Sequence, residues 1–384
     1  MKDAINIENK GDIIMSDFRK KVEEDWESYK KDKSKELYPN ILLMGISGAG
    51  KSSLINKIFR VNLAKISNIR PETREFNFYS GKYYNMTVNL IDSAGYEMNQ
   101  GKTYLKEINN ILANGMRVSG EVEYIHVVWY CIPITNKRIE DIDIKMLKNF
   151  TTNITVRDKV CIVFTKCDED TEDGEIANEF RRILEEECNY KFPSFETSTD
   201  PEFDESLQLS ELLNWSANAI DDDDLRKKFI GSQMHDLELK HREAKKIIVA
   251  STVSAAGIGA VPIPFSDSVL LVPVQVTMIG KIIDTYGVSN LATLSDAVIV
   301  DLVVSQLGKS FVTKIIKLIP IAGQVVGSLI DASVASAITG GLGTAISEIC
   351  YRSVEKYLKG ESVMWDQIFV KSEIMDIMKN YMKK

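Results

Sequence analysis

A glycine-rich run that ends in lysine and serine is the clearest chemical feature of this chain. Residues 45–52 read GISGAGKS, directly after the apolar run 41–44 and before the helix-like stretch 53–59. Glycines let backbone N–H groups turn inward around an anion, and the N-terminus of a helix adds a favourable dipole. The spacing therefore predicts a phosphate loop. Its cradle is assigned to Gly45, Ser47, Gly48, Ala49, Gly50, Lys51, Ser52 and Ser53.

Two side chains of this loop have chemical roles of their own. Lys51 would bridge the outer phosphates of a nucleotide, and the Ser52 hydroxyl would hold Mg²⁺. Some 40 residues later, at about the distance such a fold requires, the apolar stretch 86–91 ends in the sequence DSAG. Asp92 at this strand end would reach Mg²⁺ through water, and the N–H of Gly95 would sense the third phosphate. By itself this motif is weak, because Asp and Gly are common at strand ends.

A second recognition motif follows another apolar run. Residues 160–164 are apolar and lead into Thr165, Lys166, Cys167 and Asp168. A carboxylate at Asp168 would accept hydrogen bonds from N1 and N2 of guanine, whereas adenine offers no such pair of donors. Thr165 would brace the phosphate loop, and Lys166 would lay its aliphatic stem along the base. The motif predicts specificity for guanine.

Two weaker signals complete this set. The segment 70–74 reads RPETR, and Thr73 on this loop would coordinate Mg²⁺ only when the third phosphate is present; Ser67 is the alternative. Residues 196–199 read ETST, and the backbone N–H of Ser198 would meet O6 of guanine. The metal ligands expected from the sequence are thus Ser52, Thr73 and Asp92.

Short apolar runs alternate with helical patterns from residue 38 to about residue 220. This alternation is typical of a mainly parallel sheet covered on both faces, so the fold class is α/β. The second and third strands are joined by only a few residues, which predicts an antiparallel hairpin there. We expect strands at 41–45, 76–80, 86–92, 124–131, 160–165 and 194–197, with helices beginning near Lys51, Lys102, Glu140, Asp173 and Leu209.

With these residues in hand, the segment 38–220 resembles translation-factor-like GTPases of the Era, septin and immunity-related type. The resemblance rests on GISGAGKSSLIN, PETR, DSAG, TKCD and ETST in that order. It implies a Ras-like P-loop domain with a mostly parallel six-stranded sheet, which binds GTP or GDP with Mg²⁺ and hydrolyses GTP. Lys51, Thr73 and Gly95 take the catalytic roles in this resemblance. Two departures are Thr165, where Asn is commoner, and Thr199 with Asp200, where Ala and Lys are usual.

The residue that would orient the attacking water is not evident. Tyr96 follows Gly95, and a tyrosine cannot position water as the amide of a Ras-type glutamine does. We therefore expect slow hydrolysis unless a switch backbone, a partner or a second copy of the chain contributes. Arg74 and Arg138 are candidates to neutralise charge in the transition state, with ordinary surface roles as the alternative. A homodimer through the GTPase domain is the corresponding expectation for a partner.

The second half of the chain predicts an all-α domain at 221–384. Residues 225–246 form one charged helical pattern, after which 247–266, 268–280 and 332–347 carry no charge. Segments 255–282 and 317–343 resemble an apolar helical domain of unassigned role that is fused to bacterial GTPases of this class. The uncharged helices either pack as a bundle or meet a membrane surface. Pro262, Pro264 and a lone Asp331 disfavour a simple membrane span.

Composition and the N-terminus narrow the function classes further. The net charge of -8 disfavours nucleic acid as a partner, because such binding needs a basic surface. Five scattered cysteines indicate reduced thiols, which predicts a cytoplasmic protein, with peripheral membrane association as the open alternative. Residues 1–37 form an N-terminal arm in which a helix over 15–38, capped at Ser16, has one apolar face. This arm would pack on the next domain or bind a partner.

Overall fold

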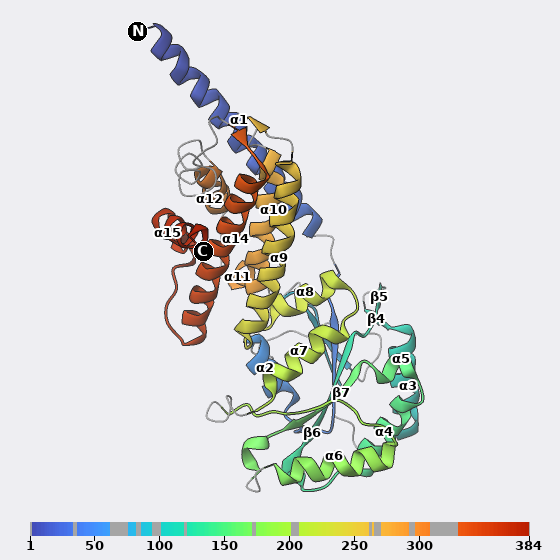
Figure 1. The fold of residues 1–384 in the computed structure, drawn as a ribbon. Coiled ribbons are helices and arrows are strands. Elements are labelled where there is room, and N and C mark those ends of the chain that lie inside the picture. The colour runs from blue at the N-terminus through green and yellow to red at the C-terminus, as the bar shows by residue number, and fades with distance from the viewer. Residues whose placement is uncertain are drawn as a thin grey trace. The chain divides into compact units, whose positions relative to one another are not determined.

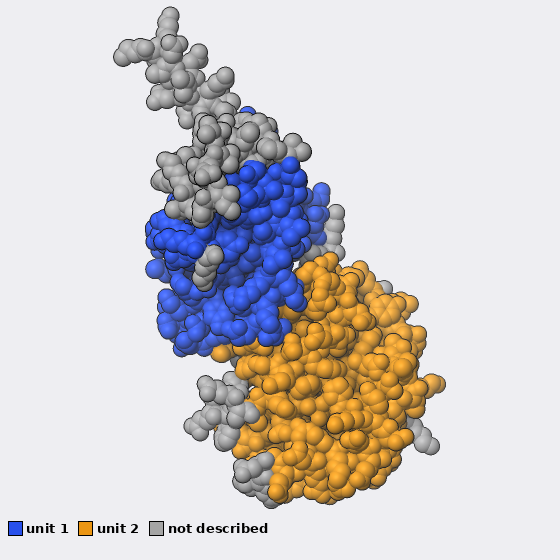
Figure 2. All heavy atoms as spheres, viewed as in Figure 1, with its two compact units in different colours: residues 1–36, 237–384 blue, residues 37–236 orange. Residues whose placement is uncertain are grey.

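The computed structural model divides the chain into two compact units, coloured separately in Figure 2. One unit comprises residues 37–236, and the other joins residues 1–36 to residues 237–384. The boundary therefore falls after residue 236, whereas the change in composition suggested residue 220. The structure describes residues 2–33, 37–61, 76–81, 86–93, 101–118, 121–170, 174–200, 207–260, 263–264, 270–291, 296–307 and 329–383.

A six-stranded sheet organises the unit formed by residues 37–236, with helices around it in Figure 1. The strand order is β2-β3-β1-β6-β7-β8, and every neighbouring pair is parallel except β2 with β3. This confirms the expected α/β class and the antiparallel hairpin. The strands are β1 (Asn40–Met44), β2 (Phe76–Tyr79), β3 (Asn89–Ser93), β6 (Val127–Pro133), β7 (Val160–Thr165) and β8 (Ser194–Glu196).

The parallel register brings the ends of the expected motifs to one edge of this sheet. β1 lies between β3 and β6, with Leu43 opposite Asp92 on one side and Trp129 on the other. β1, β6 and β7 are buried along their whole length, as expected for strands covered on both faces. In open α/β sheets, ligands bind at the carboxyl ends of the strands where the strand order reverses. That position is the carboxyl end of β1.

Seven helices accompany this sheet within the described residues of the unit. The helices α3, α4 and α6 contribute Ile108, Phe150 and Phe180 to the core on one face. The helices are α2 (Lys51–Phe59), α3 (Gly101–Asn114), α4 (Asp141–Thr151), α5 (Ile154–Arg157), α6 (Glu175–Cys188), α7 (Leu209–Ala219) and α8 (Asp223–Ser232).

Three boundaries differ from those that the sequence predicted. The strand expected from Tyr124 begins at Val127, and residues 124–126 connect it to a separate hairpin of β4 (Met116–Val118) and β5 (Glu121–Glu123). The strand expected from Met86 begins at Asn89. The charged helix expected over 225–246 is two helices, because the chain leaves α8 and turns at residues 233–236.

The regular structure in the described residues of the other unit is helical, apart from one short bridge between β9 (Ile263–Pro264) and β10 (Leu329–Ile330). Three of its helices, α9, α10 and α14, pack against one another. Gly343 permits this close approach, because a Cβ there would lie 2.8 Å from the Met278 sulfur. The helices are α1 (Lys2–Lys33), α9 (Leu237–Ile258), α10 (Val272–Tyr286), α11 (Val288–Leu291), α12 (Asp296–Leu307), α14 (Ala332–Leu358) and α15 (Lys371–Met382).

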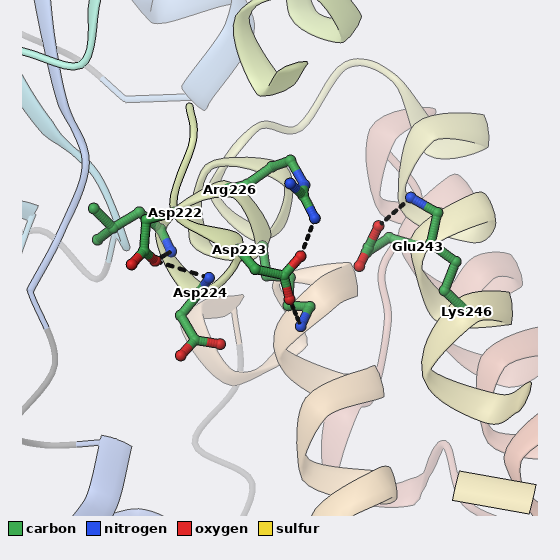
Figure 3. A network of polar contacts seen from close by, with 8 residues as sticks. Asp222, Asp223, Asp224, Arg226, Glu243 and Lys246 are labelled. Atoms are coloured by element: carbon green, nitrogen blue, oxygen red, sulfur yellow. Dashed lines mark hydrogen bonds and ion pairs between the residues drawn. The ribbon is translucent and has the colours of Figure 1, made fainter. Parts of the chain in front are cut away.

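The expected uncharged helices are present, with their ends set by polar residues. Asp331, the lone acidic residue between uncharged runs, caps α14 by accepting from the N–H of Val334 at 2.9 Å. In Figure 3, Glu243 and Lys246 form an ion pair on the charged first half of α9. Across the parts of the chain that the structure describes, no helix has both the length and the apolar character that crossing a bilayer requires.

The N-terminal helix is part of the helical unit, since α1 packs on α10 and α12. It runs from Lys2 to Lys33, so Ser16 lies inside it and the prediction of a helix start at that residue was wrong. Tyr29 donates to Asp284 at 2.6 Å, and Trp26 donates to Asp296 at 2.8 Å. Val22 on the same helix is fully buried and adds apolar packing to these hydrogen bonds. Of the two roles expected for this helix, packing within the protein and binding a partner, these contacts support packing.

The buried side chain of His126 should make the stability of the unit of residues 37–236 depend on pH. Its Nδ1 accepts the N–H of Asn40 at 3.0 Å, and burial together with the charge of Lys159 lowers its pKa to about 4. The unfolded chain takes up this proton near pH 6.5, so stability is lost as the pH falls from 6.5 through 4. We expect a loss of about 1–3 kcal/mol from this residue.

The measurement is thermal unfolding of the parent and of His126→Asn between pH 7 and pH 4. Asparagine keeps an acceptor but does not titrate, so its melting temperature should fall less over this range by roughly 2–10 °C. Equal slopes for the two proteins would contradict the role of His126.

Candidate nucleotide site

The glycine-rich loop connects β1 to α2 in a conformation that requires glycine at two positions. Gly45 has φ 133°, and a Cβ there would lie 2.3 Å from the carbonyl oxygen of Cys131. Gly50 has φ 82° and occupies the cap position of α2. The left-handed backbone turns successive N–H groups toward one side of the loop, as an anion-binding cradle needs. Ser47, Gly48, Ser52 and Ser53 are exposed, and Ala49 is buried beneath them.

Lys51 folds back over the loop that precedes it. Its Nζ donates to the carbonyl oxygens of Gly45 at 2.9 Å and Ile46 at 3.1 Å, and the side chain is buried. Since the ammonium group has three donor positions, it can hold the loop and meet an anion placed within the loop. A buried cation held by two backbone carbonyl groups favours the approach of negative charge.

Thr165 fixes the loop from the neighbouring part of the sheet. It ends β7, and its Oγ1 donates to the carbonyl oxygen of Ala49 at 2.7 Å. This is the bracing contact that the sequence predicted, made by threonine in place of the commoner asparagine. Lys166 follows with φ 59°, and this left-handed turn places the backbone for a short helix that contains Asp168. The geometry links the phosphate loop to the segment expected to recognise the base.

Asp168 and Ser198 lie together although 30 residues separate them. Ser198 Oγ donates to Asp168 Oδ1 at 2.5 Å and accepts the N–H of Asp200 at 2.8 Å. The backbone of the same loop is tied to β7, because the Thr197 N–H donates to the Phe164 carbonyl at 2.8 Å. A hydroxyl donor on one carboxylate oxygen orients the carboxylate and leaves its other oxygen open to a ligand. The backbone of residue 200 thus helps to hold Ser198 in place.

Asp92 is a buried carboxylate at the carboxyl end of β3. Its Oδ1 is enclosed and has no hydrogen-bond partner among the described residues, and Ser93 Oγ beside it has none either. Burial raises the pKa of Asp92 to about 6, against the opposing charge of Lys51. Mg²⁺ prefers carboxylate and hydroxyl oxygens, so an orphaned oxygen on a carboxylate that interacts with the charge of Lys51 fits this ion. Ser52 and Asp92 would hold it.

The raised pKa of Asp92 makes a prediction about stability. The folded state holds the proton more tightly than the unfolded chain, so the stabilising contribution is complete below pH 3.8 and lost as the pH rises through 6. At pH 7.5 the ionised side chain is therefore a cost to the folded state. Asp92→Asn should stabilise the nucleotide-free protein in EDTA by about 1–3 kcal/mol.

Melting of the parent and of Asp92→Asn at pH 5 and pH 7.5 tests this expectation. The advantage of the variant should be present at pH 7.5 and should shrink at pH 5, where the parent carboxyl is already neutral. An advantage that is the same at both pH values would show that charge is not the cause.

Several sequence-predicted residues are not brought into this site by the described structure. Thr73 and Gly95 lie outside the described residues, as do Ser67, Arg74 and Tyr96. Arg138 is exposed and pairs with Glu140 at 2.9 Å, which favours its surface role. The described residues also hold no group of three or more His, Cys, Asp and Glu side chains gathered as a metal site.

One contact that shapes the phosphate loop could not be predicted from the sequence. The carbonyl of Cys131 on β6 presses against Gly45 and determines that this position has no side chain. A backbone atom of any residue could make this contact, so the residue type carries no signal. All five cysteines are free and buried.

Comparisons with known proteins define the class. A family described as 50S ribosome-binding GTPase matches residues 40–166, which contain the loop, Asp92 and Thr165. These residues form a P-loop GTPase domain, and the match covers well under half of the 384-residue chain. No curated protein sequence gave a significant match.

Solved structures that are similar to this chain include three proteins at low identity. A bacterial selenocysteine-specific elongation factor, EF-Sec, is 16% identical over 48% of this chain and 29% of its own, with a TM-score of 0.30. A dimerization-deficient mutant of Toc33 from Arabidopsis thaliana is 17% identical over 48% and 79%, with a TM-score of 0.30. A mutation variant of SsGBP is 13% identical over 48% and 58%, with a TM-score of 0.30. The chain thus spans less than a third of EF-Sec.

Proposed function

We propose that this chain binds GTP with Mg²⁺, hydrolyses it to GDP and phosphate, and uses the nucleotide state to act on its helical unit. The observation that carries the proposal is the meeting of three separate groups at the carboxyl ends of β1, β3 and β7. These groups are the Lys51 cradle, the orphaned carboxylate of Asp92 and the Asp168–Ser198 pair. The Lys51 cradle would bind phosphate, Asp92 would bind the metal ion, and the Asp168–Ser198 pair would bind guanine.

Each group has a defined task in this proposal. The backbone N–H groups of the loop and the Lys51 ammonium hold the phosphates, and they neutralise charge as the outer phosphoryl group is transferred. The open oxygen of Asp168 accepts the N–H donors of guanine, while Ser198 holds the carboxylate in position. Ser52, Asp92 and Thr73 would hold Mg²⁺, which would supply positive charge to the phosphate oxygens. Gly95 would contact the outer phosphate through its backbone.

Slow hydrolysis by a single chain is the further part of the proposal. Tyr96 occupies the position after Gly95 and offers no amide to orient water. A second copy of the chain is the simplest source of the missing group, which makes a homodimer through the GTPase domain part of this proposal. GTP and ATP turnover measured at rising protein concentration tests both parts. The rate per molecule should climb with GTP and stay near background with ATP.

The possible results of this assay separate the alternatives. A constant rate per molecule with GTP would remove self-association and keep the GTPase. Equal turnover of ATP and GTP would remove the guanine specificity. No turnover together with tight GTP binding would favour a nucleotide-gated module that does not depend on hydrolysis.

A membrane-associated module is the second candidate function, favoured by the exposed face of α9. Val249 and Val253 lie one turn apart there and are 63% and 67% exposed. Lys245 and Lys246 precede them on the helix, so apolar and basic side chains that suit an anionic lipid surface follow each other. Flotation with liposomes that contain anionic lipid, in GTP and in GDP, tests this candidate. Failure to float in either state would exclude it.

A further inference from the structure

The last segment of the GTPase unit is a helix and a tight turn that lead directly into the helical unit. Helix α8 is followed by residues 233–236, and α9 begins at Leu237. Asp222 caps α8 by accepting the N–H groups of Asp224 and Leu225, both at 2.9 Å, as Figure 3 shows. Asp223 forms ion pairs with Arg226 and Lys227 in the next turn. The start of α8 is thus fixed by its own side chains.

The turn after α8 is held by one buried side chain. Gln233 is fully buried, and its Oε1 accepts the N–H groups of His235 and Asp236, both at 2.8 Å. Its Nε2 donates to the carbonyl oxygen of Asp236 at 2.8 Å. One amide therefore closes the turn from both sides, and α8 and the turn can move as a single rigid piece.

This piece is hydrogen-bonded to the far ends of two elements of the nucleotide site. The N–H of Met234 donates to the carbonyl oxygen of Ile58 at 2.7 Å, near the end of α2. Thr87, just before β3, donates from its Oγ1 to the Lys228 carbonyl at 2.7 Å, and its N–H lies 3.4 Å from Ser232 Oγ. The opposite ends of α2 and β3 carry Lys51 and Asp92.

We propose that α8 and residues 233–236 form the transmission segment that carries the nucleotide state from α2 and β3 to the first turn of α9. This inference rests on the proposed function. A shift of α2 or β3 that accompanies binding at Lys51 or Asp92 moves the opposite end of the same element, because helices and paired strands move as stiff bodies. Met234, Thr87 and Ser232 make the contacts at those ends, and the rigid turn passes the displacement to Leu237.

Burial supports this assignment over a loose surface helix. Phe229 and Ile230 are 0% and 2% exposed, and Met234 and Thr87 are buried as well. The buried residues of the transmission segment therefore cannot slide without breaking packing, and packed interfaces shift between discrete arrangements. None of these residues belongs to the nucleotide site described above.

The test compares amide hydrogen exchange at residues 237–246 in GDP and in a non-hydrolysable GTP analogue, both with Mg²⁺. The parent should show a difference of about threefold or more between the two states. The double variant Thr87→Val with Ser232→Ala removes both side-chain contacts at nearly constant volume. Its ratio should fall to about one, while its affinity for the nucleotides changes less than about twofold.

A matched control loses a buried hydroxyl elsewhere in the same unit. Tyr130→Phe removes a donor to Asp143 at 2.7 Å and leaves α8 untouched, so it should keep the parent ratio. Gln233→Leu, which frees the turn, is the second variant and should also reduce the ratio to about one. Melting and nucleotide affinity establish that each variant is folded.

The results separate this inference from the proposed function. A parent that binds no guanine nucleotide overturns both. A parent that binds GTP without any change at residues 237–246 overturns the transmission segment alone. A nucleotide-dependent ratio that survives in the double variant and in Gln233→Leu also overturns it, because the contacts then serve only packing.

Discussion

Asp168→Ala should abolish the preference for guanine nucleotides and weaken GTP binding by roughly 10²–10⁴-fold. The parent carboxylate offers one oxygen to the ligand while Ser198 holds the other at 2.5 Å. Hydrogen bonds to a charged group contribute about 1.5–3 kcal/mol each, and guanine donates from both N1 and N2. With alanine, GTP and ATP should bind about equally weakly. Calorimetry on nucleotide-stripped protein in magnesium buffer measures both.

Asp168→Asn gives this prediction a control that retains shape. In xanthine a carbonyl group replaces the N2 amino group of guanine. An asparagine amide can donate to that carbonyl and accept from N1–H, so the variant should prefer XTP over GTP while the parent prefers GTP. Retention of GTP preference in this variant would show that Asp168 does not contact the base. Ser198→Ala should cause a smaller loss, because it removes only the group that orients the carboxylate.

Lys51→Ala should weaken binding of GTP by roughly 10²–10⁴-fold and leave the preference for guanine over adenine intact. The ammonium group lies within the loop, 2.9 Å from the Gly45 carbonyl, and its removal deletes the charge that would pair with the outer phosphates. Two charge-assisted contacts of about 1.5–3 kcal/mol account for this range. Fluorescent GDP and GTP titrations measure the loss, which should be larger for GTP.

Lys57→Ala is the matched control for this variant. Lys57 lies on the same helix, near its last turn, and its loss changes the net charge by the same amount. Its affinity for GTP should stay within about twofold of the parent, because a partly exposed charge is screened over a distance of several ångströms. Equal losses in the two variants would indicate a general effect of charge and would contradict the cradle.

Local chemistry explains why much of the fold and site could be predicted from the sequence. The buried strands at β1 and β7 are uniformly apolar because both faces are covered, and such runs are visible without a structure. The loop at residues 45–52 depends on glycines at positive φ, which leave a clear signature. Helix starts near Lys51 and Leu209 and the β2–β3 hairpin follow from the same local patterns.

Other features were missed because they depend on contacts between distant residues. Helix α1 extends to Lys2, and its place in the helical unit depends on Asp284 and Asp296, far along the chain. The β4–β5 hairpin lies within residues 116–123, where no strand was expected from the sequence. The break between α8 and α9 depends on the single buried amide of Gln233, since the charge pattern continues through it.

The sequence by itself determined the chemistry of the site: a glycine loop with Lys51, an acid at the end of a strand, and an acid at Asp168. These features can be recognised in short segments of sequence, because the chemistry at each position requires a particular residue type. Only the tertiary structure decided that Ser198 orients Asp168, that Asp92 is buried with a raised pKa, and that Cys131 restricts Gly45. Such properties arise when parallel strands align their carboxyl ends, because burial and electric field depend on neighbours that the sequence does not place side by side.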